Sequence, residues 1–205
     1  MKYSLLGLLM FVTTSLHATH FSYTEGVVNN GDFEVSREVK AGTNSVEVSY
    51  RWGGFSVEKT TVDGQVLHLI KMNNLADLEE KGCPKLPVVN DLLSVASSHV
   101  KVEILDAEYK EYKEFMVYPS QGAIAQTETD TLGNLMFSDV YQTNSYYPAN
   151  NVSVVEVQAY RSYPFATVRF CPIQYNPVTK VVKCCTHVTY RLSWSKNDYQ
   201  SSVTS

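Results

Sequence analysis

The sequence predicts an all-β protein, an antiparallel β-sandwich or open barrel that carries one long irregular loop. The 14 tyrosines, together with many valines and threonines, are typical of half-buried strands. Short segments in which apolar and polar residues alternate recur along the chain, with turn residues such as Asp63-Gly64 between them. Residues 119–151 are instead rich in Gln, Thr, Asp, Asn and Gly and show no period. We therefore expect this stretch to form the long loop.

The amino-terminal residues 1–18 have the features of a signal peptide. Lys2 supplies a basic start, Leu5–Val12 form an apolar run, and Ala18 closes a plausible cleavage site. The run is short for a bilayer span, and no later segment reaches that length. We expect export to the periplasm, the cell surface or the medium, without stable membrane insertion; an uncleaved anchor is the alternative.

The β domain is expected to span residues 45–194, between a loosely ordered arm at 19–44 and a polar tail at 195–205. Asp63-Gly64 should join two strands in a hairpin. The predicted strands cover residues 45–50, 55–61, 66–72, 100–105, 108–112, 115–118, 152–160, 163–171 and 181–194.

Three details of this strand pattern can be tested by the structure. Residues 75–80 suggest one or two turns of helix. The segments 108–112 and 115–118 should pair with residues 100–105. In the last strand, one face should carry Val182, Cys184, Thr186, Val188, Tyr190 and Leu192.

Composition and motifs exclude several functional classes. Charged residues make up 19% of the chain, the net charge is −4, and no basic cluster occurs, which argues against a nucleic-acid partner. The sequence contains no Walker loop, no GxGxxG and no EF-hand spacing. We therefore expect no cofactor.

The four cysteines are Cys83, Cys171, Cys184 and Cys185. Because neighbours in a strand point to opposite faces, Cys184 and Cys185 should not bond each other. Three full pairings are conceivable, and buried or partly paired structural cysteines are the favoured interpretation. No CxxC spacing occurs, so we expect no metal site.

The cysteine and histidine closest in sequence are Cys185 and His187, which strand alternation places on one face, roughly 6–7 Å apart. That distance is too long for a base to activate a thiol, so we assign no catalytic residue. His68 and His99 lie among apolar neighbours and are expected to be structural.

Four segments in register resemble the N-terminal prodomain of gingipain-type cysteine peptidases of Bacteroidetes. They are residues 80–88 (EKGCPKLPV), 118–122 (YPSQG), 146–148 (YYP) and 170–180 (FCPIQYNPVTK). The motif residues that carry the resemblance are Gly82, Pro84, Pro87, Pro119, Gly122, Pro148, Gln174, Tyr175, Asn176 and Pro177.

This resemblance implies a non-catalytic domain that helps fold the peptidase catalytic domain and blocks its active-site cleft. The blocking segment would be the loop that follows the YPSQG motif, namely Ala123, Ile124, Ala125, Gln126, Thr127 and Glu128. Gln126 stands where arginine-specific members carry a basic residue. The resemblance thus implies a neutral specificity pocket in the target, or an anchor elsewhere; alternatively, Gln126 is a solvated loop residue.

Two other functions remain open. Tyrosines and tryptophans on exposed strands would suit a surface module for adhesion or carbohydrate binding, and a coplanar exposed pair would favour it. Catalysis by Cys185 and His187 is the other. In the family a catalytic domain follows the prodomain, whereas this sequence stops soon after its last strand. The chain is thus expected to be a stand-alone relative, a truncated product or an isolated prodomain.

Overall fold

The computed structural model describes residues 18–122, 135–160 and 163–195, with no α-helix in these ranges. Residues 1–17, 123–134, 161–162 and 196–205 lie outside these ranges. They include most of the expected signal peptide, part of the expected long loop and most of the expected polar tail. The strands are β1 (Thr19–Ser22), β2 (Gly26–Val28), β3 (Val35–Ala41), β4 (Ser45–Trp52), β5 (Gly54–Val62), β6 (Gln65–Lys71), β7 (Ala76–Asp77), β8 (Pro87–Ser94), β9 (Val100–Tyr112), β10 (Val152–Tyr160), β11 (Tyr163–Phe170), β12 (Ile173–Asn176) and β13 (Val181–Trp194), and one 3₁₀ turn, η1, covers Asp139–Gln142.

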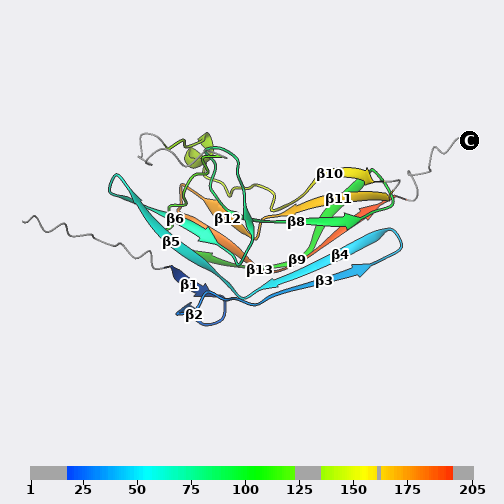
Figure 1. Ribbon diagram of the computed structural model, residues 1–205, viewed down its shortest axis with the longest axis horizontal. Coiled ribbons are helices and arrows are strands. Elements are labelled where there is room, and N and C mark those ends of the chain that lie inside the picture. The colour runs from blue at the N-terminus through cyan, green and yellow to red at the C-terminus, as the bar shows by residue number, and fades with distance from the viewer. Residues whose placement is uncertain (1–17, 123–134, 161–162, 196–205) are drawn as a thin grey trace, which may run out of the picture.

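These strands form three sheets and confirm the all-β prediction. Their orders are β2-β1-β5-β6, β10-β11-β8-β7 and β12-β13-β4-β3, with β9 paired along β13. The molecule is elongated (Figure 1). The end that holds β1, β2, β5, β6 and β12 is here called the loop end, and the end that holds β3, β4, β8, β10 and β11 the sheet end.

The strands β9 and β13 form a ribbon that runs through both ends. One edge of β13 pairs with β9, while its other edge pairs first with β12 and then with β4. The register with β9 shifts between Cys185 and His187, leaving Thr186 as a bulge. Cys184 lies opposite Lys110, whereas Cys185 lies opposite Tyr109, so the two thiols face opposite sides of the ribbon.

The bulge gives the ribbon a core face on each side. Val182 and Cys184 are buried on one face, before the bulge, and Val188, Tyr190 and Leu192 on the other, after it. The predicted single face containing Thr186 is therefore wrong, because one extra residue inverts the alternation. Cys185 and His187 lie on opposite faces for the same reason.

A different aromatic cluster fills each end. At the loop end the Phe21 ring stacks on Phe55 at 4.9 Å, and Tyr112 meets Phe55 edge-on at 5.1 Å. At the sheet end Trp52 stacks between Tyr50 (5.0 Å) and Phe170 (5.5 Å). These rings belong to one continuous set of buried residues, so the two ends share a single core.

A buried carboxylate joins the two layers of the sheet end. Asp91 on β8 is 6% exposed and accepts hydrogen bonds from the hydroxyls of Tyr50, at 2.9 Å, and Tyr190. The Arg37 guanidinium on β3 contacts the same carboxylate at 2.8 Å. Burial and this carboxylate raise the pKa of both tyrosines. Asp91 thus links β3, β4, β8 and β13 by side chains alone.

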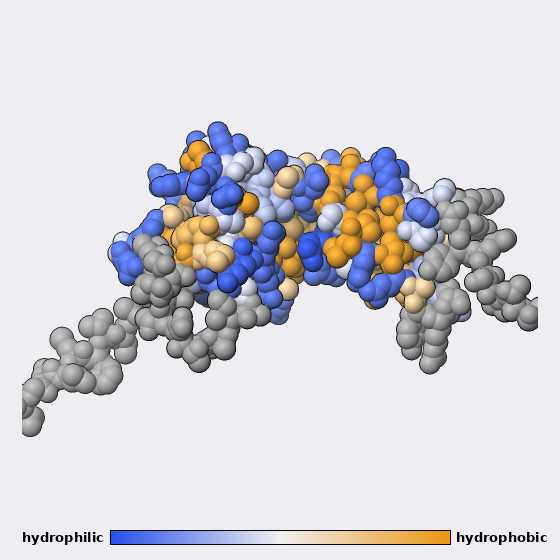
Figure 2. Space-filling view, turned by 90° about the horizontal axis from the view of Figure 1, so that it is seen from above, coloured by the Kyte–Doolittle hydropathy of each residue, from blue (hydrophilic) through white to orange (hydrophobic). Residues whose placement is uncertain are grey.

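The surface differs between the two ends. Figure 2 shows apolar atoms gathered over the half of the molecule that holds β8, β10 and β11. Exposed apolar side chains of the sheet end include Leu92 and Val155. In the described part of the chain no helix is long and apolar enough to cross a membrane.

Three local predictions differ from the structure. The arm expected over residues 19–44 contains β1, β2 and β3, since Phe21 packs into the aromatic cluster and β3 pairs with β4. In place of the helical turn expected at residues 75–80, Ala76–Asp77 form β7, and directly after it the Leu78 amide donates to the Leu86 carbonyl at 2.7 Å. Residues 100–112 form one strand, β9, instead of two that pair with each other. The Asp63-Gly64 hairpin between β5 and β6 is confirmed.

Candidate functional site

The expected inhibitory residues Ala123–Glu128 lie outside the described residues, but the chain on both sides of them is described. We call this surrounding structure the loop base. It comprises residues 81–86, 115–122, 135–148 and 173–177, at the loop end of the molecule (Figure 1). All of the motif residues except Pro87 lie in it; Pro87 begins β8 and pairs with Asp77.

The entry to the loop runs alongside the segment around Gly82 and Pro84. Pro84 and Pro119 face each other in an antiparallel bridge. The Ser120 amide donates to the Cys83 carbonyl at 2.8 Å, and the Gly82 amide donates to the Ser120 carbonyl at 2.6 Å. Proline has no backbone N–H and so cannot donate to a continuous ladder. It is tolerated at Pro84 and Pro119 because they form an isolated bridge and not part of a longer ladder.

Gln121 connects the two sides of the loop directly. Its Oε1 accepts the Met136 amide at 2.9 Å, and its Nε2 donates to the Met136 carbonyl at 3.2 Å and to the Pro119 carbonyl at 3.0 Å. The side-chain amide of Gln121 therefore makes the pair of hydrogen bonds across the loop that backbone groups would make in a hairpin. Gln121 lies within the YPSQG segment, but no role was predicted for it. The available signal was a side-chain amide directly after Pro119-Ser120, at the start of the irregular stretch.

Gly82 holds the exit of the loop. Its carbonyl accepts the Ser138 amide at 2.9 Å, and its φ of +80° is one that side-chain-bearing residues rarely adopt. A Cβ at this position would stand 3.0 Å from the Ser138 nitrogen. The glycine is therefore required both by its backbone conformation and by the close approach of residue 138.

The second group of motif residues supports the exit segment. Tyr147 and Tyr175 exchange two backbone hydrogen bonds of 2.8 Å, and the Gln174 side-chain Nε2 donates to the Pro148 carbonyl at 2.7 Å. Asn176 Nδ2 donates to the Asn144 side chain at 3.0 Å. Pro177 is buried in the turn that follows β12. The structure thus brings together motif residues that are far apart in the sequence.

Two phenols, the partly buried Tyr141 and the buried Tyr175, hold the segment 115–118 that leads to the loop. Tyr141, from η1, donates to the Val117 carbonyl at 2.7 Å, and Tyr175 donates to the Phe115 carbonyl at 3.0 Å. Burial raises the pKa of Tyr175 to about 12 and raises that of Tyr141 as well. Both hydroxyls therefore stay protonated and donating at any physiological pH.

His68 on β6 also holds the segment 115–118. Its backbone bonds to Met116 and Tyr118, and its Nδ1 accepts the Met116 amide at 3.0 Å. Burial lowers the pKa of this imidazole. A neutral ring accepting a backbone N–H is a structural arrangement, as the sequence predicted for this residue.

The cysteines are arranged as core residues. All four are buried and unbonded to one another. Burial raises the pKa of Cys171 and of Cys185 to about 12, so these thiols are protonated at neutral pH. The Cys185 thiol donates to the His187 carbonyl at 3.0 Å, while the imidazole lies on the other face of the ribbon. This pair does not have the geometry of a nucleophile and its base.

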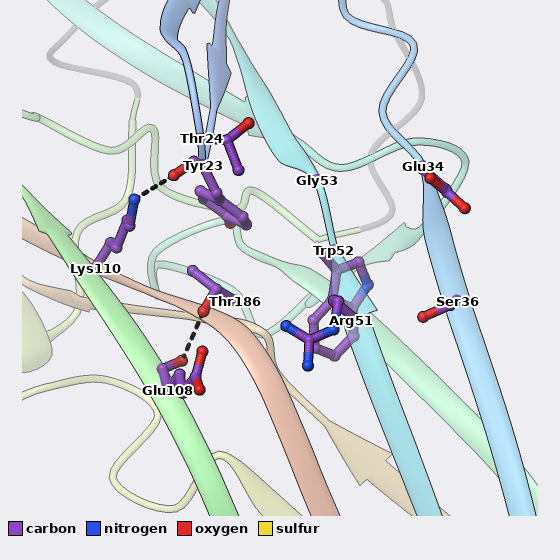
Figure 3. A pocket seen from close by; sticks show the side chains of 10 residues that line it. All are labelled: Tyr23, Thr24, Glu34, Ser36, Arg51, Trp52, Gly53, Glu108, Lys110 and Thr186. Atoms are coloured by element: carbon purple, nitrogen blue, oxygen red, sulfur yellow. Dashed lines mark hydrogen bonds between the residues drawn. The ribbon is translucent and has the colours of Figure 1, made fainter.

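A cavity of about 400 Å³ lies where the two ends meet, beside the Thr186 bulge (Figure 3). Lys110 donates to the Tyr23 carbonyl, and the Thr186 hydroxyl donates to the Glu108 carbonyl at 3.4 Å. The residues that line the cavity carry two cations and two carboxylates but neither a thiol nor an imidazole. They are Tyr23, Thr24, Glu34, Ser36, Arg51, Trp52, Gly53, Glu108, Lys110 and Thr186. These charges balance, so the cavity does not select one sign of ligand.

The aromatic pairs bear on adhesion or carbohydrate binding. Each stacked pair among the described residues includes at least one buried ring, so these pairs belong to the core. Tyr163, which is 69% exposed, does not belong to any of these stacked pairs. The described surface therefore offers no coplanar aromatic platform of the kind that this function would favour.

Comparison with known proteins identifies the family. The chain matches the family model Propeptide_C25 over residues 30–204, a wider range than the β domain expected from the sequence. Gingipain R1 of Porphyromonas gingivalis is 30% identical over 118 residues, 57% of this chain and 12% of that protein. Gingipain R2 of the same species is 27% identical over 128 residues, 62% of this chain and 17% of that protein. The chain thus spans less than a fifth of the length of these relatives.

Two solved structures share the fold. One is a complex of Porphyromonas gingivalis RgpB pro- and mature domains, with a TM-score of 0.72 and 23% identity over 82% of this chain and 90% of that one. The other concerns the zymogenic latency of gingipain K from the same species, with a TM-score of 0.65 and 13% identity over 87% of this chain and 99% of that one. At these identities the likeness establishes the fold.

The three-sheet body and its loop base define a β-rich propeptide domain. The chain belongs to the Propeptide_C25 family, the propeptides of gingipain-type cysteine peptidases.

Proposed function

We propose that this domain is exported, binds the catalytic domain of a gingipain-type cysteine peptidase, assists its folding and occludes its active-site cleft. The occluding segment is Ala123–Glu128. The observation that carries this proposal is the loop base, where Gln121 and Gly82 join the two sides of residues 123–134. Cys185 and His187 lie on opposite faces of the β9–β13 ribbon and do not form a catalytic pair.

The loop base supports this proposal because it lowers the entropic cost of binding. An interface loses affinity when it must order a free segment, because conformational entropy is lost at that moment. Fastening residues 121 and 136 to each other removes part of that loss before the peptidase is met. A segment presented from such a base can therefore enter a cleft at lower entropic cost than a free peptide of the same sequence.

Specificity depends on Gln126. An acidic pocket holds a guanidinium by charge-assisted hydrogen bonds, often in bidentate geometry, and a neutral amide cannot replace them. If Gln126 occupies the specificity pocket, the pocket of the target is neutral. An arginine-specific peptidase should therefore be inhibited weakly by this chain and at least about tenfold more strongly by the Gln126→Arg variant.

The test is inhibition of a gingipain-type peptidase by the full chain, measured as Ki on a peptide substrate. Replacing Ala123–Glu128 by a Gly-Ser segment of equal length should abolish inhibition, while the same replacement of residues 129–134 serves as the matched control. Absence of inhibition by the unaltered chain at large molar excess would overturn the function. Equal inhibition by both replacements would retain the function and overturn the loop assignment.

A further inference from the structure

β3 is an open edge of its sheet. It pairs with β4 along Val35–Ala41 and ends the strand order, and every one of its residues is exposed. An edge strand presents a row of unpaired backbone N–H and C=O groups, which another strand can use. β3 is seven residues long, enough for a substantial intermolecular ladder.

The core is incompletely covered beside this edge. Val35 lies opposite Trp52 and Val39 opposite Val48, so both valines are on the core face, yet they are 40% and 45% exposed. A groove of about 630 Å³ runs between β3 and β8. Trp194 lines it and has a buried indole N–H without a hydrogen-bond partner among the described residues. An additional strand on β3 would cover apolar surface that is now in contact with water.

The sequence of β3 is complementary to itself in antiparallel pairing. With a twofold axis at Val39, Glu38 lies opposite the partner's Lys40 and Lys40 opposite the partner's Glu38, both on the outer face. Val39 meets the partner's Val39 on the core face. Moving the axis to Glu38 or to Lys40 places two like charges opposite each other, which is unfavourable. The strand therefore selects one register.

The two charged residues are available for this pairing. Neither Glu38 nor Lys40 forms a salt bridge with any described residue. In the ladder Glu38 faces Ser49, and Lys40 faces Glu47, whose carboxylate is bound by Arg191 at 2.6 Å. Arg37, on the core face, is already engaged by Asp91 and would face the partner's Ala41, which is small.

We propose that β3 pairs with β3 of a second copy of this chain, forming a symmetric dimer with one continuous sheet. A second copy is the expected partner because the charges of β3 complement those of another β3 in the antiparallel orientation. The edge belongs to the sheet end, away from the loop base (Figure 1). The dimer therefore leaves the proposed peptidase-binding loop free in both copies and does not depend on the proposed function.

The test is the molar mass of the purified chain, measured by sedimentation equilibrium from low to high micromolar concentration. The mass should double with concentration. Lys40→Glu and Glu38→Lys should each raise the dimer dissociation constant by about tenfold or more, since each variant creates two like-charge pairs. Combining the two substitutions restores both pairs with reversed sign and should restore the dimer.

Lys59→Glu is the matched control, because it makes the same charge change on an exposed residue of β5, at the other end of the molecule. It should leave the dimer unchanged, and circular dichroism verifies that each variant is folded. A chain that stays monomeric at every concentration overturns the proposal. A dimer that survives both single reversals, or is not rescued by the double variant, overturns it equally.

Discussion

The two ends of the molecule are stabilised in different ways. The sheet end has long ladders, such as β10 with β11 and β8 with β11, and one buried carboxylate that joins four strands. The loop base has isolated bridges and many single hydrogen bonds from side chains to backbone. At the sheet end several side-chain hydrogen bonds converge on one residue, Asp91, whereas at the loop base such bonds are distributed over many residues. If the loop is presented to a peptidase as proposed, the second arrangement favours it, because each hydrogen bond constrains a different point of the backbone.

The largest effect is expected from Asp91→Ala at the sheet end. It would leave the Tyr50 and Tyr190 hydroxyls and the Arg37 guanidinium without their common acceptor. We expect a loss of about 3 kcal/mol in the free energy of unfolding, measured by urea denaturation. Arg37→Ala should cost less because this side chain is 41% exposed. A loss below about 1 kcal/mol for Asp91→Ala would show that the hydrogen bonds converging on it contribute little to stability.

Gly82→Ala should have the next largest effect and acts on the loop base. The new Cβ meets the Ser138 nitrogen at 3.0 Å, and the φ of +80° is itself unfavourable, so we expect about 2 kcal/mol of destabilisation. Gly64→Ala is a matched control, with the same φ of +80° and open space around its Cβ. It should cost about 1 kcal/mol. Equal losses for the two variants would mean that the contact with Ser138 is unimportant.

Gln121→Ala should have a smaller effect on global stability, about 1 kcal/mol or less. Its main consequence should be local, because the two sides of the loop lose their direct connection. We expect faster cleavage within residues 123–134 in limited proteolysis followed by mass spectrometry. Gln142→Ala, on an exposed residue of η1, is the control and should leave the cleavage rate unchanged. Unchanged cleavage in Gln121→Ala would show that the loop base does not depend on this amide.

The smallest expected effect is a pH dependence at the loop end, due to His68. Burial lowers the pKa of this imidazole in the folded state, whereas in the unfolded chain the pKa of histidine is about 6.5. Below that pH the unfolded state takes up a proton that the folded state resists, so the stability contributed by neutral His68 is complete above pH ~6.5 and is lost as pH falls toward the folded-state pKa. The slope of unfolding free energy against pH should therefore be shallower in His68→Gln. An identical slope in both proteins would contradict this assignment.

Alternation predicted most of the strands because one face of each is buried. It failed in the amino-terminal region, since β3 is an edge strand whose polar residues are compatible with exposure. It also failed at residues 75–80, where contacts with residue 86 override a local helical preference. The Thr186 bulge leaves no trace in the sequence, because Cys184 and Cys185 are both apolar and alternation continues on either side.

The motif segments contain residues that the structure gathers at the loop base, but they did not predict how these residues meet. The bridge between Pro84 and Pro119 joins two such segments. The contact between Gln121 and Met136 joins a side chain to a backbone across the loop, and such a contact imposes no periodic pattern on either residue. The register of a bulged ribbon and the partners of a side-chain amide are properties of three-dimensional packing.

The β9–β13 ribbon also has a consequence for the removal of the domain. Because β9 and β13 contribute to the packing of both aromatic clusters, a cut in this ribbon would weaken the packing at both ends of the molecule. A single proteolytic break in it would expose apolar surface at both ends simultaneously and make the remaining pieces substrates for further degradation. If the chain acts as proposed and is displaced from a peptidase, one cut in this ribbon should therefore be enough to start its degradation.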